Sequence, residues 1–350
     1  MAVSDVSDER VNEVHASAIV VDGLGAWGDL EKVENSDGLR QGGHTAVSVT
    51  VAHLHDFKTA VQRVSHFKSI IRSAPDKLVV AETVRDIREA KEADVLAIIL
   101  SFQDTRPIEK DLGYIELFYN MGIRIIQLTY NTQNFVGAGC CELDNRGLTY
   151  FGREVISSLG SMGIVVDVSH CCEQTTLDAI KYSKNPVIAS HASALAVSPA
   201  GRNKSDRVIR ALADKGGVIG VTFQPFMVKM DKQSYEALPS TSDDVVKHID
   251  HIVSLVGIDH VAFGSDLTDA WTDRGYPPPE SSFRTWRTLR PDCFGKGPTD
   301  SYDKPVEGLK YHRDLPNLTR SLLQRGYSTE DVHKVLGGNF LRVFLDVWKG

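Results

Sequence analysis

Three residues at the ends of apolar runs have the side-chain types of a hydrolytic metal site. His170 ends the run GIVVDVSH, His191 ends NPVIASH, and Asp266 ends DHVAFGSD. Neutral imidazoles bind Zn²⁺-type metals, and a nearby carboxylate can take a proton from an activated water. A single histidine could equally cap its strand. The three together, each at the end of an apolar run, favour catalysis or metal binding.

Other apolar runs also end in side chains that can hydrogen-bond or coordinate. Gln103 and Tyr130 follow two of them, and His53 and His55 follow the run TAVSVTVA. The Gln103 amide and the Tyr130 phenol could contact a substrate that is bound beside His170, His191 and Asp266. The two histidines could supply further ligands, or they could simply open the next helix.

Eight short apolar runs, separated by amphipathic segments, must position these groups. The runs lack polar alternation, as is typical of parallel strands buried on both faces. Strands that alternate with helices in this way predict an α/β fold, a single (β/α)8 TIM-type barrel with catalytic groups at the carboxyl ends of its strands. The eight predicted strands are residues 17–22, 45–52, 94–101, 122–130, 163–170, 185–191, 216–223 and 259–266.

The chain reads as one barrel domain spanning residues 1–350. After the eighth strand, residues 268–300 contain three consecutive prolines and many turn-forming residues, which predicts a long loop that covers the active site. C-terminal helices follow and close the barrel. Their expected core residues are Leu336, Phe340, Val343, Phe344 and Trp348.

Composition narrows the choice of partners and compartment. The formal net charge of −7 argues against nucleic acid or an anionic membrane as the main partner. The start MAVSDVSDERVNEVHA lacks the basic and apolar parts of a signal peptide, and no run is long enough to span a membrane. The five cysteines include no CxxC spacing. We therefore expect a cytoplasmic protein with reduced thiols.

Several segments, in order along nearly the whole chain, resemble the membrane (renal) dipeptidase family. They are GLTYFGREVISSLGSMGIVVDVSH, PVIASHASALAV, GRNKSD, HVAFGSDLTD and GGNFLRVFLDVW. The resemblance implies that His170 and His191 bind metal, that Arg202 grips a substrate carboxylate, and that Asp266 is catalytic. It also implies dipeptide hydrolysis by a hydroxide that bridges two zinc ions.

The sequence departs from the family pattern at the first metal. The family ends its first strand with Asp-Gly-His-x-Asp, whereas this chain has Leu24 and Ala26 at the two ligand positions. The bridging glutamate falls on Gln103, and a histidine that polarises the substrate carbonyl falls on Tyr130. These changes remove one metal site and retain the histidines of the other.

We therefore predict a dipeptidase-like hydrolase that uses one divalent metal, zinc by preference, and possibly none. Its substrate would be a small carboxylate-bearing amide or related C–N compound, held by Arg202, Gln103 and Trp27, with Asp266 and Tyr130 catalytic. Further metal ligands could be Gln103, Asp266, His53 or His55.

The alternatives are a metal-free lyase or isomerase with His, Tyr and Asp as acid–base groups, and a non-catalytic relative. The resemblance also suggests a homodimer. The remaining pocket candidates are Phe102, Phe223 and Trp271.

Overall fold

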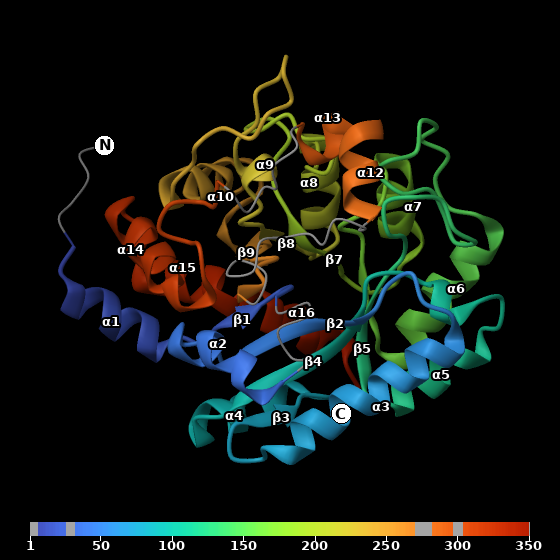
Figure 1. Ribbon diagram of the computed structural model, residues 1–350, viewed down its shortest axis with the longest axis horizontal. Coiled ribbons are helices and arrows are strands. Elements are labelled where there is room, and N and C mark those ends of the chain that lie inside the picture. Colours follow the sequence, from blue (N-terminus) through green and yellow to red (C-terminus); the bar gives the residue numbers. More distant parts are fainter. Residues whose placement is uncertain (1–5, 26–31, 270–281, 297–303, 350) are drawn as a thin grey trace.

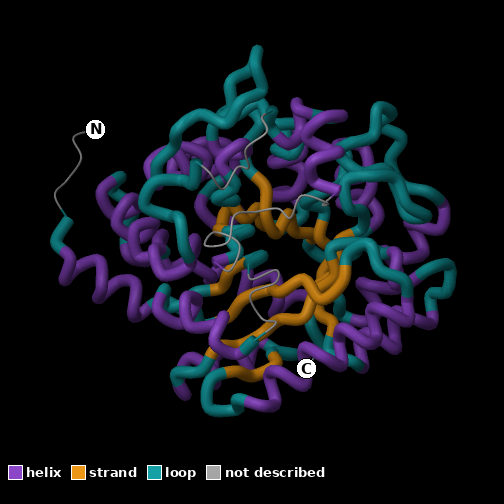
Figure 2. The backbone as a smooth tube through the Cα atoms, viewed as in Figure 1, coloured by secondary structure: helices purple, strands orange, loops and turns teal. Residues whose placement is uncertain are grey.

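A computed structural model describes residues 6–25, 32–269, 282–296 and 304–349. Eight parallel strands follow one another in the order β1-β2-β4-β5-β6-β7-β8-β9, and the helices lie outside them (Figures 1 and 2). The predicted barrel is therefore confirmed. The strands are β1 (Val21–Asp22), β2 (Ala46–Ala52), β4 (Leu96–Phe102), β5 (Ile123–Gln127), β6 (Val165–Asp167), β7 (Val187–Ala192), β8 (Val218–Val221) and β9 (Val261–Phe263).

Each of the eight predicted strands coincides with one of these. An additional short strand, β3 (Leu78–Val80), pairs with β4 outside the barrel path. Its three residues are too few to form a recognisable apolar run. The seam between β1 and β9 is joined by hydrogen bonds from Gly23 N to Phe263 O (3.2 Å) and from Asp266 N to Leu24 O (2.8 Å).

Several of the surrounding helices begin at a polar cap. Ser205, for example, accepts a hydrogen bond from Val208 N and caps α8. The α-helices are α1 (Asp8–Ser17), α2 (Asp37–Gln41), α3 (Phe57–Ser73), α4 (Val84–Ala93), α5 (Gly113–Asn120), α6 (Tyr150–Met162), α7 (Glu173–Tyr182), α8 (Asp206–Asp214), α9 (Pro225–Val228), α10 (Ser242–Val256), α12 (Ser282–Leu289), α13 (Pro291–Phe294), α14 (Pro316–Gln324), α15 (Thr329–His333) and α16 (Asn339–Val347).

The predicted loop 268–300 lies partly outside the described residues, and its described part includes the short helices α12 and α13. No helix within the described ranges is both long enough and apolar enough to cross a membrane. All five cysteines are free thiols.

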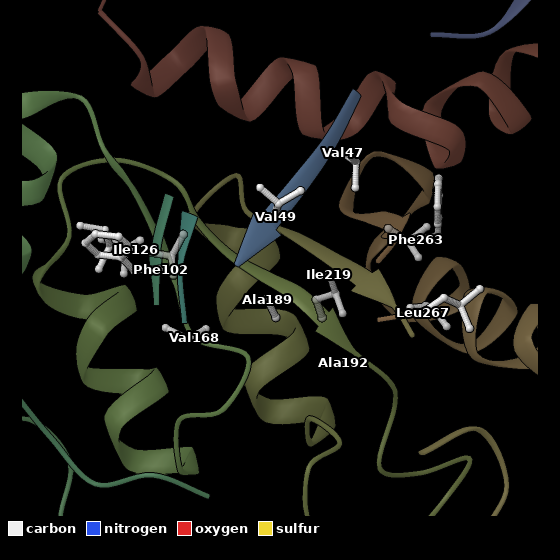
Figure 3. Close-up of a cluster of buried hydrophobic side chains, with 14 of the residues drawn as sticks. Val47, Val49, Phe102, Ile126, Val168, Ala189, Ala192, Ile219, Phe263 and Leu267 are labelled. Carbon is white, nitrogen blue, oxygen red and sulfur yellow. The ribbon is translucent and has the colours of Figure 1, made fainter. Parts of the chain in front are cut away.

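The apolar core has two layers. A larger cluster joins the strands to the surrounding helices, and Figure 3 shows Val49, Ala189, Ile219 and Phe263 among its members. A second cluster takes residues from all eight barrel strands and adds Phe340 and other residues of α16. The five expected core residues of the C-terminal helices are all buried.

Inside the barrel the strands approach one another closely at their carboxyl ends. A Cβ atom on Gly264 would lie 1.9 Å from Ser190 O, and one on Gly23 would lie 2.6 Å from the Phe340 ring. Only glycine fits at either position, because any side chain would overlap with those atoms. This close approach brings the ends of β1, β7 and β9 to one narrow mouth.

Candidate active site

The two predicted histidines meet at this mouth. His170 lies three residues beyond β6, His191 lies in β7, and their Nε2 atoms are 2.9 Å apart. Both side chains are buried. Burial, reinforced by the charge of Arg202, holds the pKa of each imidazole well below its usual value. Both histidines are therefore neutral at physiological pH.

Asn131 fixes the tautomer of His170. The side-chain oxygen of Asn131 lies 2.5 Å from Nδ1 of His170. Because this oxygen can only accept, the imidazole proton is on Nδ1 and the Nε2 atom carries a lone pair. Asn131 itself has a left-handed backbone, with φ of 65°. Its main-chain oxygen accepts a hydrogen bond from Cys141 N, which ties down the loop after β5.

A short relay from Asp167 fixes the tautomer of His191. The Ser190 hydroxyl donates to Oδ2 of Asp167 (2.6 Å) and lies 2.8 Å from Nδ1 of His191. Since the hydroxyl proton is used on the carboxylate, Ser190 Oγ must accept from the Nδ1 proton of His191. Ser169 donates to the other carboxylate oxygen at 2.6 Å. The Nε2 atom of His191 therefore also carries a lone pair.

Two lone pairs directed at one point fit a single divalent cation. Zn–N bonds are about 2.0–2.1 Å long, so two nitrogen ligands of a tetrahedral ion lie roughly 3.3 Å apart, close to the observed separation. Hydrogen bonds that orient the distal nitrogen are usual for metal-binding histidines. The donor set is incomplete, however. Among the described residues no group of three or more His, Cys, Asp or Glu side chains could hold a metal.

Within the described residues, Asp266, His53 and His55 do not join the two histidines in such a group. His53 packs its ring on His55 and Tyr130, with centroids 5.0 Å and 5.3 Å away. Burial lowers the pKa of His53 to about 3. The two histidines after β2 thus form part of the wall beside Tyr130. Of the predicted further ligands, Gln103 remains.

Gln103 and Arg202 each reach one of the two imidazoles. Nε2 of Gln103 lies 3.4 Å from Nε2 of His191, and Nη2 of Arg202 lies 2.9 Å from Nε2 of His170. Arg202 also donates through Nη1 to Ser169 O, and it is buried. The structure therefore brings both of these predicted residues to the histidine pair.

Asp266 and Tyr130 lie at the same mouth. Burial and the charge of Asp22 raise the pKa of Asp266 to about 7, although Arg202 and a hydrogen bond from Gln224 act in the opposite direction. Tyr130 stacks on His170 with ring centroids 4.4 Å apart. Burial and the negative charge of Asp266 raise the pKa of the phenol, so it keeps its proton.

None of the three described residues that follow β1 has a side chain that could bind a metal. Leu24 is buried and apolar, and Ala26 and Trp27 lie outside the described residues, as does Trp271. Phe102 and Phe223 are core residues of the larger apolar cluster. Asp22, which precedes Leu24, is fully buried and directs its carboxylate at Ser265.

Sequence reasoning identified the histidines but missed the residues that orient them. These are Asn131, Asp167 and Ser190. Their signal was present, because each lies near a candidate histidine or follows another candidate directly in the chain. Lys204 was missed as well. It is buried and donates from Nζ to Val168 O and Cys171 O, which fixes the turn that carries His170.

Comparison with known proteins agrees with this geometry. Residues 28–273 and 293–349 match the model of the membrane dipeptidase family, peptidase family M19. The chain is 26% identical to dipeptidase tcpJ of Claviceps purpurea over 84% of its length, and the match spans 61% of that relative. It is 29% identical to an uncharacterized protein of Klebsiella pneumoniae over 82% of its own length and 96% of that protein.

Among solved structures, an amidohydrolase from Pseudomonas aeruginosa superposes with a TM-score of 0.82 and 34% identity. The alignment covers 97% of this chain and 99% of that one. The chain therefore belongs to the membrane dipeptidase family.

Proposed function

We propose that this protein is a metal-dependent hydrolase that cleaves the amide bond of a dipeptide or a related small carboxylate-bearing substrate. One divalent ion, zinc by preference, would be held by His170 and His191, with Gln103 as the remaining polar neighbour. Family membership and the dipeptidase name of the Claviceps relative support the reaction class.

One observation carries the proposal of a single ion. The Nε2 atoms of His170 and His191 are 2.9 Å apart, and both carry lone pairs because both Nδ1 protons are already donated elsewhere. A cation is the natural partner for two lone pairs that face one point. The end of β1, by contrast, has Leu24 at the position where the family has a ligand, so a second ion would lack its donors.

The charged residues of the mouth would bind and orient the substrate. Arg202 presents a guanidinium that can grip a carboxylate with two parallel hydrogen bonds. Tyr130 keeps its proton and can donate it to the oxygen of the scissile carbonyl. Trp27, the remaining predicted substrate contact, lies outside the described residues. A substrate with a free carboxylate next to the scissile bond fits this set.

Asp266 would carry the proton. A bound divalent ion would activate water for attack on the carbonyl carbon. The pKa of Asp266, about 7, allows this carboxylate to accept the proton from water and pass it to the leaving nitrogen at neutral pH. A general acid–base group works best when its pKa lies near the operating pH, which supports this role.

A second candidate is a metal-free lyase or isomerase, and one observation favours it. The lone pairs of His170 and His191 already face the guanidinium of Arg202 and the amide of Gln103. These donors can satisfy both imidazoles without a cation. In this case His170, His191, Tyr130 and Asp266 would act as acid–base groups, and activity would survive chelation.

The deciding experiment measures metal and activity together. Protein purified without a histidine tag would be analysed for metal per chain, then assayed on a panel of dipeptides and N-acyl amino acids before and after dialysis against a chelator. We expect one ion per chain and hydrolysis that is lost on chelation and restored by Zn²⁺ or Mn²⁺. Two ions per chain would contradict the single-site proposal. Turnover that is unaffected by chelation would favour the second candidate.

Two further properties are proposed with this function. The five free thiols and the net charge of −7 support a reducing, cytoplasmic compartment with no nucleic-acid partner. The family resemblance supports a homodimer. Light scattering coupled to size-exclusion chromatography would measure the molar mass, and a mass of one chain would refute the dimer.

A further inference from the structure

Asp22 ends β1 with a fully buried carboxylate that hydrogen-bonds both to its own following turn and, across the seam, to the turn after β9. Its Oδ1 accepts from Ser265 N at 2.8 Å and from Leu24 N at 3.1 Å. Its Oδ2 accepts from the Ser265 hydroxyl at 2.5 Å. These bonds link the first strand of the barrel to the turn after the last one.

Asp266, the next residue after Ser265, has an unusual backbone. Its φ is 54°, in the left-handed region that side-chain-bearing residues seldom adopt. Its N–H donates to Leu24 O at 2.8 Å, and its carbonyl accepts from Nε2 of Gln224 at 2.6 Å. Such conformations persist where the surroundings hold them, and they are common at active sites.

Ser265, which precedes Asp266 in the chain, and Leu24, in the turn after β1, both constrain the backbone of Asp266. Asp22 fixes Ser265, the residue before Asp266, and it also fixes Leu24, whose carbonyl accepts the Asp266 N–H. Loss of the Asp22 carboxylate would release both supports together. It would leave Gln224 alone on the far side of Asp266.

His44 also lies beside the Asp22 carboxylate, but it does not replace Ser265 or Leu24 as a hydrogen-bond donor to it. Nε2 of His44 lies 3.7 Å from Oδ2 of Asp22 and forms no hydrogen bond. Nδ1 of His44 lies 3.0 Å from Leu39 O, so it carries the proton and Nε2 carries the lone pair. Burial lowers the pKa of His44, which keeps it neutral. The carboxylate therefore makes its hydrogen bonds to Ser265 and Leu24.

We propose that Asp22, acting through Ser265 and Leu24, is the positioning residue that keeps Asp266 in its left-handed conformation with its carboxyl at the mouth of the barrel. The inference rests on the proposed function only in taking Asp266 as the proton carrier. It gives the end of β1 a role in a chain where Leu24 and Ala26 coordinate nothing.

Crystal structures and steady-state kinetics of three variants test this inference. In Asp22→Ala we expect Asp266 to leave the left-handed region, and kcat on the best dipeptide substrate to fall about 10²-fold with little change in KM, because a misplaced catalytic group costs rate. Asp22→Asn keeps an oxygen that can accept from Ser265 N and Leu24 N, so it should restore part of the rate. Ser265→Ala removes the hydroxyl contact to Asp22 together with the acceptor for Leu267 N, keeps the backbone bond from Ser265 N, and keeps the test open if Asp22→Ala does not fold.

Ser240→Ala is the matched control, because Ser240 is a buried serine whose hydroxyl makes no hydrogen bond to any described residue. Its kcat should equal that of the wild type. An unchanged Asp266 backbone in Asp22→Ala, or a kcat no lower than that of the control, would overturn the inference. If the wild type hydrolyses no substrate on the panel, the proposed function fails. The crystallographic comparison would still decide the role of Asp22.

Discussion

The two sides of the barrel mouth differ in their polar side chains. One side presents unprotonated imidazole nitrogens, and the other has a carboxylate whose oxygens are already hydrogen-bonded. On the side of β6 and β7, His170 and His191 point unprotonated Nε2 atoms at one another. On the side of β1 and β9, Leu24 is apolar, and the Asp22 carboxylate is taken up by hydrogen bonds to the turns around it. The first side presents two unprotonated nitrogens, which the proposed function assigns to a cation, and the second side holds a carboxylate in place.

Under the proposed function, the metal ligands at the end of β1 are absent, but the carboxylate that supports the turn carrying Asp266 remains. The end of β1 has no ligand side chain at Leu24, yet Asp22 still reaches across the seam to the turn that carries Asp266. A single site on the β6–β7 side and a positioned base on the β1–β9 side can still form one hydrolytic centre. Four predictions test this division.

The largest effect is expected from His191→Ala, which removes one of the two lone pairs. Metal content should fall from about one ion per chain to background, and hydrolysis should fall with it, since one imidazole cannot hold the ion. Elemental analysis and the dipeptide assay measure both quantities. His248→Ala is the control, because His248 is a buried histidine that binds only Ala194 N and Val228 O. Metal retained in His191→Ala would remove the β6–β7 side from metal binding.

Asp266→Asn tests the other side. We expect kcat to fall about 10²–10⁴-fold, because the amide cannot accept the proton, while metal content stays unchanged. In the wild type the rate should rise with pH up to about 7, where Asp266 loses its proton, and then level off. A variant that kept the wild-type profile would show that another group carries the proton.

Asp266 also links activity to stability. Its pKa of about 7 in the folded protein exceeds the usual value of 3.8, so the folded state binds this proton more tightly than the unfolded chain does. The free energy of unfolding should therefore decrease as pH rises from about 4 to about 7. The free energy of unfolding of Asp266→Asn should not show this decrease, because the amide does not titrate. Its melting temperature, compared with that of the wild type, should be relatively higher at pH 8 than at pH 4.

The third prediction concerns the residues that orient the histidines. Asn131→Ala and Ser190→Ala leave both Nε2 atoms present but free the rings to rotate or change tautomer. Loss of such partners typically weakens metal affinity about 10–100-fold. Competition with a chromophoric chelator would measure this change. Equal affinity in wild type and both variants would mean that packing alone orients the rings.

The smallest effect is expected from Tyr130→Phe, which keeps the ring stacked on His170 and removes one hydroxyl. A single hydrogen bond contributes about 0.5–1.5 kcal/mol, so kcat/KM should fall by no more than roughly 10-fold. A much greater loss would give Tyr130 a larger share of catalysis than carbonyl binding. An unchanged rate would exclude its hydroxyl from the reaction.

The barrel and the main site residues were predictable because their signals are local. Apolar runs mark the eight strands, and a parallel barrel gathers whatever follows them, which located His170, His191 and Asp266. Nonlocal relations were not predictable. The bond from Asp22 to Ser265 joins residues 243 positions apart, and the choice of tautomer on His191 depends on which atom Ser190 uses as a donor. Whether a third ligand joins the two histidines depends on distances that spacing in the sequence does not encode.

The interior of the barrel also sets a constraint on when the protein can finish folding. Phe340 and other residues of α16 belong to one apolar cluster with side chains from every barrel strand, and a Cβ atom on Gly23 would lie 2.6 Å from the Phe340 ring. Since α16 follows all the strands in the chain, a ribosome must make the entire sheet before the helix that seals it is available. Until then the inner faces of the strands are exposed to water. Nascent chains of this protein are therefore expected to depend on chaperones until translation has passed α16.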